Sequence, residues 1–356
     1  MTWFPVGPEA VTAEWLSRLI DADVRRIRLE QIGIGVGIMG RLYRAHLQGT
    51  GAPASVVLKF PTLDPVARTA ICEDLEFYLR EVRFYQEIGL ANTLPPARPY
   101  FAAFDDATND FVLVLEDLGH LRLADQTAGC QRADAELVVD AIARHHAEWW
   151  ESPRFATLSW LKTFTTPPFP DVVATNFAKG WQRFLDLVGA QLAADVRGFG
   201  ERFPSLAPWL VADLARPPCT FLHGDLRLDQ LFFAVGPGDA PVTALDWQIT
   251  SKGRGAYDLG YFLSQSMDTE LRRTCERELL ERYRERLAER GVSYPATELE
   301  RDYRNTIAWC FSYAVIAAGR VDVANDRQLQ LLQAMTDRSV AAMEDHRALT
   351  VGLGDR

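Results

Sequence analysis

The chain has 356 residues, of which 48% are hydrophobic and 24% are charged. This length and composition suffice for one large or two medium-sized globular domains with hydrophobic cores. The formal net charge of −10 argues against nucleic acid as a partner, because binding to phosphate backbones requires a basic surface. The same charge is compatible with a cationic substrate.

Cysteine usage and hydropathy narrow the class of protein further. No pair of cysteines has the spacing of zinc ligands, and isolated cysteines in odd number are typical of a reducing compartment. No apolar run approaches the ~20 residues of a membrane-spanning helix, and the first residues lack a signal-peptide pattern. We therefore expect a cytoplasmic protein with no membrane span. The cysteines are Cys72, Cys130, Cys219, Cys275 and Cys310.

The first 115 residues predict a β-rich lobe that carries one internal helix. Helical spacing of apolar residues predicts helices at about 8–22 and 66–88. A glycine-rich run at 33–40 separates the first two of the predicted strands. These strands are rich in branched and aromatic residues, and they lie at 27–29, 41–47, 55–60, 100–104 and 111–116.

The rest of the chain is mainly helical, so the expected fold class is α+β. Two short apolar runs, 220–222 and 242–245, predict strands among the helices, with a turn at 236–239 between them. We expect an N-terminal lobe over 1–115, a hinge at 116–120 and a mainly helical lobe over 121–356. The helical patterns lie at 133–151, 171–196, 205–215, 268–290, 297–319 and 326–346.

Two carboxylates, Asp225 and Asp246, each follow one of these short predicted strands. We expect both acids at one end of a small sheet, with the amide of Gln230 near them. One acid could accept a hydroxyl proton. The other acid and the amide oxygen could hold Mg²⁺ on the phosphates of a nucleotide.

The glycine-rich run is a candidate phosphate-binding loop. Glycines at 33, 35, 37 and 40 would let backbone amides approach phosphates closely. The run is not a Walker A loop, because no Gly-Lys-Ser/Thr follows, and it is not a Rossmann fingerprint, because a strand rather than a helix follows. A plain glycine-rich hairpin is the alternative.

Glu81 is the one acid in an otherwise apolar stripe along residues 77–88. A buried glutamate requires a cation, and Lys59, in a strand of branched apolar residues, is the candidate. In kinases such a pair of a strand lysine and a helix glutamate positions the α- and β-phosphates. The alternative is a solvated Glu81 paired with Arg80 or Arg83.

The segment Glu116-Asp117-Leu118-Gly119 follows a predicted strand of consecutive apolar residues, at the point where the β-rich lobe ends. Its backbone N–H and C=O groups could bind an adenine ring. A simple linker between domains is the alternative.

Taken together and in their order along the chain, the motifs resemble those of the aminoglycoside phosphotransferase and choline kinase superfamily. The resemblance spans about residues 25–320, and the run 253–263 together with Asp-Trp-Gln looks like its ecdysteroid-kinase-like branch. It implies a protein-kinase-like two-lobe fold, with a small β-rich lobe and a larger helical lobe. The motifs are the glycine loop, Leu58-Lys59, Glu81, Leu113 to Leu118, His223-Gly224-Asp225 and Leu245-Asp246-Trp247-Gln248.

The resemblance implies a kinase that uses ATP and Mg²⁺ to phosphorylate a hydroxyl group of a small molecule. It makes Asp225 the catalytic base and places Arg227 near the γ-phosphate. Asp258 and His223 would brace the catalytic loop. The nucleotide would contact Gly35, Gly37, Lys59, Glu81 and the backbone of Glu116 and Leu118, and the metal would contact Gln230 and Asp246.

One residue departs from the family pattern, which has asparagine where this chain has Gln230. Glutamine is one methylene longer, and this could weaken the second metal site. The alternative function is therefore a pseudokinase-like module that binds a nucleotide or metabolite with little turnover. A protein kinase is disfavoured, because no Ala-Pro-Glu element occurs after residue 268. The acceptor is not predicted, and either a monomer or a homodimer is expected.

Overall fold

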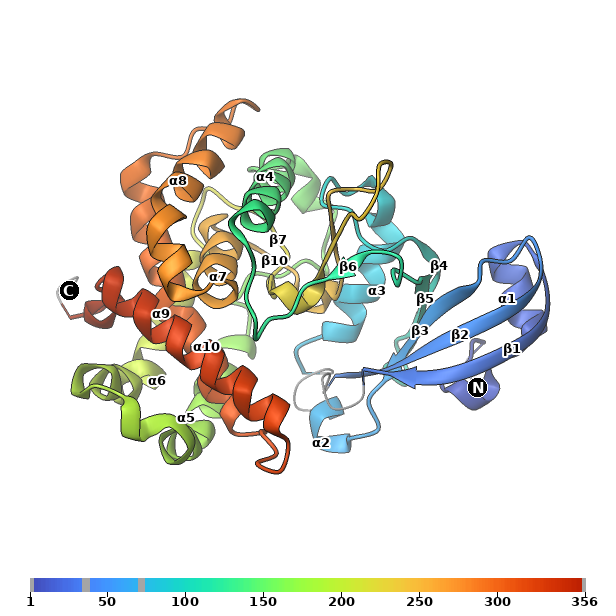
Figure 1. Ribbon diagram of the computed structural model, residues 1–356, viewed down its shortest axis with the longest axis horizontal. Helices are drawn as coiled ribbons and strands as arrows, with labels where there is room; N and C mark the ends of the chain where they lie inside the picture. Colours follow the sequence, from blue (N-terminus) through green and yellow to red (C-terminus); the bar gives the residue numbers. More distant parts are fainter. Residues whose placement is uncertain (1–2, 34–38, 70–73, 354–356) are drawn as a thin grey trace. The chain divides into compact units, whose positions relative to one another are not determined.

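The computed structural model describes residues 3–33, 39–69 and 74–353 (Figure 1). The chain divides into two compact units. Unit 1 lies within residues 1–122 and 234–249, and unit 2 lies within 123–233 and 250–356. Asp246 therefore belongs to unit 1, whereas Asp225 belongs to unit 2. The hinge at 116–120 stays a prediction.

Unit 1 is built on a five-stranded antiparallel sheet with the strand order β1-β2-β3-β5-β4. The connection between β3 and β4 carries α3, so β5 returns to pair with β3 and β4 forms an edge. The strands are β1 (Asp23–Ile32), β2 (Gly40–Thr50), β3 (Ser55–Pro61), β4 (Pro99–Asp105) and β5 (Asp110–Glu116).

Strand alternation places the core of unit 1 on one face of this sheet. Val56, Leu58 and Phe60 of β3 are fully buried in a cluster with residues of β5 and α1 (Ala13–Ile20). Successive side chains of a strand point to opposite faces, so Lys59 projects from the other face. That face carries α3 (Phe77–Glu87), which contacts β4 and β5.

The helices of unit 1 are shorter than the sequence pattern predicts. The single helix predicted over 66–88 is wrong, because α2 (Pro65–Ala67) and α3 are separate. Glu76, directly before α3, has a φ of 56°, a left-handed conformation that ends any helix running into it. The helix predicted over about 8–22 is also divided, into a 3-10 helix at Pro8–Ala10 and the shorter α1.

The described part of unit 2 is mainly helical (Figure 1). Every residue of α7 is buried, and α9 packs against α5, α6, α7 and α10. Unit 2 therefore has its core around α7 and α9. The helices are α4 (Arg132–Trp149), α5 (Phe169–Val188), α6 (Ala194–Leu214), α7 (Ala256–Ser266), α8 (Thr269–Ala288), α9 (Ala296–Ala318) and α10 (Asp326–Asp345).

Helix α6 begins earlier than predicted and continues through Pro204 and Pro208. Each proline removes one backbone donor from the helix. The buried side chains of Phe203, Ala207 and Leu210 hold the helix in the core around these positions. Burial of this apolar face outweighs the local preference of proline to end a helix.

Four short strand segments accompany the helices in sequence. In unit 2, β7 (Thr220–Leu222) pairs antiparallel with β10 (Ser251–Gly253), and β8 spans Leu231–Phe233. In unit 1, β9 spans Val242–Ala244. The expectation that Asp225 and Asp246 lie at one end of a single small sheet is therefore wrong, because β7 and β9 belong to different sheets. A two-residue strand, β6 (Arg122–Leu123), lies at the boundary between the units in sequence.

Within the described ranges, no helix combines the length and the apolar character that crossing a bilayer requires.

Candidate functional site

Lys59 lies between two carboxylates in unit 1. Its Nζ is 2.8 Å from each carboxylate oxygen of Glu81 on α3, and 2.7 Å from Oδ1 of Asp246. The side chains of Lys59 and Glu81 are both buried. The structure thus brings together three predicted site residues from a strand, a helix and a distant loop.

Two acids share one lysine in this cluster. Burial raises the pKa of Glu81 to about 7, and the charge of Asp246 adds to this against the opposing effect of Lys59. Burial by itself would lower the pKa of Lys59, but the charges of Asp246 and Glu81 raise it above its ordinary value. Lys59 therefore stays protonated.

Asp246 is held in an uncommon backbone conformation. Its φ is 65°, in the left-handed region that aspartate adopts more readily than most residues. The following Trp247 stacks on Phe84 of α3, with ring centroids 4.1 Å apart and planes 8° from parallel. Phe84 lies one helical turn after Glu81, so α3 positions both acids of the cluster.

Gln248 gives this cluster a second oxygen suited to a metal ion. Its Nε2 donates to Oδ2 of Asp246 at 3.1 Å. Its Oε1 is buried and has no hydrogen-bond partner among the residues that the structure describes. Carboxylate and amide oxygens are the ligands that Mg²⁺ prefers, so Asp246 and Gln248 fit this cation.

No group of three histidine, cysteine, aspartate or glutamate side chains in the described ranges could hold a metal by itself. Mg²⁺ in nucleotide enzymes is commonly bound by one or two carboxylates together with water and substrate phosphates. The oxygens of Asp246 and Gln248 are therefore too few to bind Mg²⁺ alone. Nucleotide phosphates and water would have to complete the set of ligands.

Asp225 lies in the loop after β7 in unit 2 and is buried. Its Oδ1 accepts hydrogen bonds from Nε of Arg227 and from the hydroxyl of Tyr261, both at 2.9 Å. Its Oδ2 has a longer contact of 3.4 Å with Nη2 of Arg227. Burial would raise the pKa of Asp225, but the charge and hydrogen bonds of Arg227 and the Tyr261 hydroxyl lower it overall.

The backbone of the same loop is fixed by Asp258 of α7. Its carboxylate accepts hydrogen bonds from the amides of His223 at 2.7 Å and Gly224 at 2.9 Å. Nε2 of His146 lies 3.2 Å from this carboxylate, and Nδ1 of His146 lies 2.7 Å from the hydroxyl of Tyr283. Burial would raise the pKa of Asp258, whereas His146 and the amide of Gly224 lower it.

The sequence matches the model of a known protein family. Residues 35–292 match the model of the ecdysteroid kinase-like family. The chain belongs to this family. No curated protein matches the chain.

Solved structures show the fold of this ecdysteroid kinase-like protein. A protein from Ralstonia eutropha JMP134, provisionally assigned as an aminoglycoside phosphotransferase, is 16% identical with a TM-score of 0.57, over 94% of this chain and 97% of that one. Choline kinase LicA from Streptococcus pneumoniae is 16% identical with a TM-score of 0.53, over 93% and 97%. The GDP complex of aminoglycoside 2'-phosphotransferase-IIIa is 14% identical with a TM-score of 0.53, over 93% and 99%. The predicted α+β, kinase-like fold is confirmed.

The remaining predicted site residues lie near the ends of elements. Gln230 ends a 3-10 turn after Arg227, and its amide donates to the Arg227 carbonyl at 3.0 Å. The amide of Glu116, at the end of β5, donates to the carbonyl of Arg98 at 2.8 Å. Leu118 is buried two residues later.

Gly35 and Gly37 lie outside the described residues. The flanking glycines, Gly33 and Gly40, lie at positions that favour glycine for two different reasons. Gly33 has a φ of 66°, which favours glycine. A Cβ at Gly40 would lie 3.2 Å from Cε of Lys59, so glycine gives the lysine side chain room to reach its acids.

Three residues near these centres had no assigned role in the sequence prediction: Gln248, Tyr261 and His146. Gln248 and Tyr261 lie in the two motifs that resemble the ecdysteroid kinase-like family. For Tyr261 the usable signal is its place three residues after Asp258, which puts both on one helix face. His146 carries no such signal, because its contact with Asp258 spans 112 residues.

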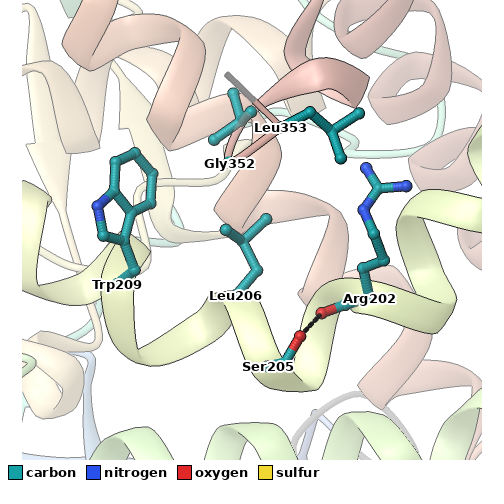
Figure 2. Close-up of a pocket in the computed structure, with 7 residues that line it drawn as sticks. Arg202, Ser205, Leu206, Trp209, Gly352 and Leu353 are labelled. Carbon is teal, nitrogen blue, oxygen red and sulfur yellow. Dashed lines mark hydrogen bonds between the residues drawn. The ribbon is translucent and has the colours of Figure 1, made fainter. Parts of the chain in front are cut away.

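A cavity of about 370 Å³ in unit 2 lies apart from these residues (Figure 2). It is lined by Arg202, Leu206 and Trp209 of α6 and by Gly352 and Leu353 near the end of the chain. Arg202 is engaged there, because its guanidinium donates to the carbonyls of Gly198 and Leu349. None of the predicted site residues lines this cavity.

Proposed function

We propose that this protein is an ATP-dependent kinase that transfers the γ-phosphoryl group to a hydroxyl of a small molecule. The observation that carries the proposal is the buried Lys59, which contacts Glu81 and Asp246 within 2.8 Å. A charged lysine fixed between a helix acid and a loop acid is the arrangement with which kinases hold nucleotide phosphates. Membership of the ecdysteroid kinase-like family supports the proposal.

In this proposal the residues of unit 1 bind the nucleotide. Lys59 contacts the α- and β-phosphates, and Glu81 keeps its ammonium group in place. Asp246 and Gln248 are the residues of unit 1 that would hold Mg²⁺, which when bound would neutralise charge on the phosphate oxygens. The family resemblance adds Gln230, a residue of unit 2, as a metal ligand. The glycine loop and the backbone of Glu116 and Leu118 orient the nucleotide.

Unit 2 supplies the base. Asp225 accepts the proton of the acceptor hydroxyl while the hydroxyl oxygen attacks the γ-phosphorus. The bond between the γ-phosphorus and its bridging oxygen breaks, and the products are ADP and a phosphate monoester. Arg227 would steady the γ-phosphate with guanidinium N–H groups other than the Nε–H that bonds Oδ1 of Asp225.

The proposal is tested by ATP consumption against a library of hydroxyl compounds, followed by two variants on any acceptor found. Asp225→Asn removes the base and Asp246→Ala removes a metal ligand, so each should lower turnover at least about 100-fold. Asp239→Asn, an exposed acid of unit 1, is the matched control and should retain activity. Full activity in Asp225→Asn or Asp246→Ala would refute the assignment.

Gln230 favours a second candidate, a nucleotide-binding module with little turnover. This candidate predicts a thermal shift with Mg²⁺ and ATP but no phosphoryl transfer to any compound of the library. Gln230→Asn shortens the amide by one methylene and should raise the rate several-fold if the longer side chain limits the metal site. Transfer by the variant alone would favour the second candidate for the natural chain.

A further inference from the structure

We infer that Tyr261 is a positioning residue for the catalytic base. Its hydroxyl holds Oδ1 of Asp225 and so leaves Oδ2 as the oxygen that accepts the acceptor's proton. This inference deepens the proposed function and rests on the assignment of Asp225 as the base.

The position of Tyr261 follows from the helix that carries it. Asp258 and Tyr261 lie three residues apart on α7, so both project from one face of the helix. The Asp258 carboxylate accepts hydrogen bonds from the backbone amides of His223 and Gly224. The Tyr261 hydroxyl donates a hydrogen bond to the side chain of Asp225 at 2.9 Å. One face of α7 thus fixes both the loop backbone and the carboxylate.

The aromatic ring of Tyr261 is itself immobilised. It is 2% exposed, and it stacks on Tyr313 of α9 with centroids 4.7 Å apart and planes 19° from parallel. The hydroxyl of Tyr313 pairs with that of Tyr257 and accepts from Nε1 of Trp309 at 3.2 Å. The Tyr261 hydroxyl is therefore presented to Asp225 from a packed aromatic scaffold rather than from a freely rotating side chain.

The hydroxyl acts as a donor toward Asp225. Burial and the charge of Asp225 hold the pKa of Tyr261 well above its ordinary value, so the phenol keeps its proton. A carboxylate oxygen accepts about two hydrogen bonds. Oδ1 already has two at 2.9 Å, from Tyr261 and Arg227, whereas Oδ2 has only the 3.4 Å contact with Arg227. Acceptor capacity therefore remains on Oδ2.

The titratable and charged groups that face Asp225 come from three elements. Arg227 and His223 belong to its own loop, Tyr261 comes from α7, and Cys310 and Tyr313 come from α9. Arg227 makes an ion pair with Asp225. Removing the Tyr261 hydroxyl would leave this ion pair in place but would take one donor from Oδ1.

The test is the variant Tyr261→Phe, which keeps the ring. The full chain is labelled with ¹³C at aspartate carboxyls and titrated by NMR, and the Asp225 signal is assigned by its loss in Asp225→Asn. Asp225 should titrate at a higher pH in Tyr261→Phe than in the natural chain, because a hydrogen bond to its charged form is lost. The matched control, Tyr257→Phe, removes a buried hydroxyl that contacts Tyr313 rather than Asp225, and should leave the titration unchanged.

Turnover provides the second readout. With ATP as the only substrate and water as the acceptor, Tyr261→Phe should lower kcat by about tenfold with KM for ATP unchanged. An unchanged Asp225 titration in Tyr261→Phe would overturn the inference, as would loss of the folded protein, which would make the hydroxyl a structural group. The NMR titration requires no turnover. An inactive natural chain, or full activity in Asp225→Asn, would thus count against the proposed function and not against this contact.

Discussion

The lysine centre of unit 1 and the aspartate centre of unit 2 are stabilised in different ways. In unit 1 the buried Lys59 lies between two acids, Glu81 and Asp246, and the pKa of Glu81 is raised. In unit 2 the buried Asp225 has one full opposite charge, Arg227, and a neutral donor, Tyr261. Removing a charge from water costs several kcal/mol unless partners replace the lost hydration.

The origin of these partners differs as well. Glu81 and Asp246 are 22 and 187 residues from Lys59 in sequence, so the first centre exists only in the folded unit. Arg227 is two residues from Asp225, and the loop backbone is fixed by a single helix. The lysine centre therefore depends on charge balance between distant elements, whereas the aspartate centre depends on local hydrogen bonding.

The largest effect should come from removing the lysine. Lys59→Met leaves Glu81 and Asp246 without their shared cation, which should destabilise the protein by about 3–5 kcal/mol and abolish binding of Mg²⁺ and ATP. Urea unfolding and a thermal shift with nucleotide measure the two effects. Lys179→Met, at an exposed position of α5, is the control and should change little. Equal stability of the two variants would show that the charges of unit 1 are not coupled as described.

In unit 2 the corresponding change is Asp258→Asn. Asparagine presents an N–H group in place of one carboxylate oxygen, so one backbone amide of the loop loses its acceptor. The cost should be about 1–3 kcal/mol in urea unfolding, below that of Lys59→Met. Asp171→Asn at an exposed position of α5 is the control. If Asp258→Asn lowers the free energy of unfolding more than Lys59→Met does, then the aspartate centre contributes more to stability than the lysine centre.

The sequence predicts part of the lysine centre. Alternation along 55–60 places Lys59 on the opposite strand face from Leu58 and Phe60, and the apolar stripe of 77–88 places Glu81 on a buried helix face. A buried acid near a buried cation then predicts the pair. The contact with Asp246 is beyond such patterns, because it depends on a left-handed residue 187 positions later in the chain.

The aspartate centre and the fold show the same limit. Helix periodicity predicts α8, α9 and α10 to within two residues at either end. It fails at 66–88, because apolar spacing carries no information on the positive φ of Glu76. Likewise, the spacing in α7 puts Tyr261 on the face of Asp258, but the partner of Tyr261 lies in a loop 36 residues earlier. Local patterns predict elements and faces, whereas contacts between loops and helices require the folded chain.

The lysine centre and the aspartate centre should affect the pH dependence of stability differently. Because the pKa of Glu81 is raised, its protonated form adds stability below its ordinary value of 4.5, and this stability is lost as the pH rises through about 7. The pKa of Asp225 is lowered, so its charged form adds stability above its ordinary value of 3.8, which is lost as the pH falls below that value. The two centres thus respond to pH with opposite signs.

Urea unfolding at a series of pH values measures this difference. As the pH rises from about 4.5 to about 7, the natural chain should lose stability relative to Glu81→Gln. As the pH falls below about 4, it should lose stability relative to Asp225→Asn. Parallel curves for the natural chain and either variant would contradict the corresponding assignment.

The smallest effect concerns the aromatic contact that ties Asp246 to α3. Phe84 and Trp247 stack at 4.1 Å, and a stacked pair contributes about 0.5–1.5 kcal/mol beyond its buried area. A double-mutant cycle with Phe84→Leu and Trp247→Leu isolates this coupling from the loss of core volume that each variant also causes. The free energy of unfolding is measured for all four proteins.

The same cycle on Phe164 and Phe169, which stack at 4.9 Å in unit 2, is the matched comparison. That pair should show a similar coupling in stability but no link to nucleotide. For Phe84 and Trp247, bound Mg²⁺ and ATP should increase the coupling, because the nucleotide is proposed to bind the acid that Trp247 follows. A coupling that nucleotide leaves unchanged would mean that α3 orients Glu81 without controlling Asp246. The lysine would then be held by two independent acids rather than by one helix.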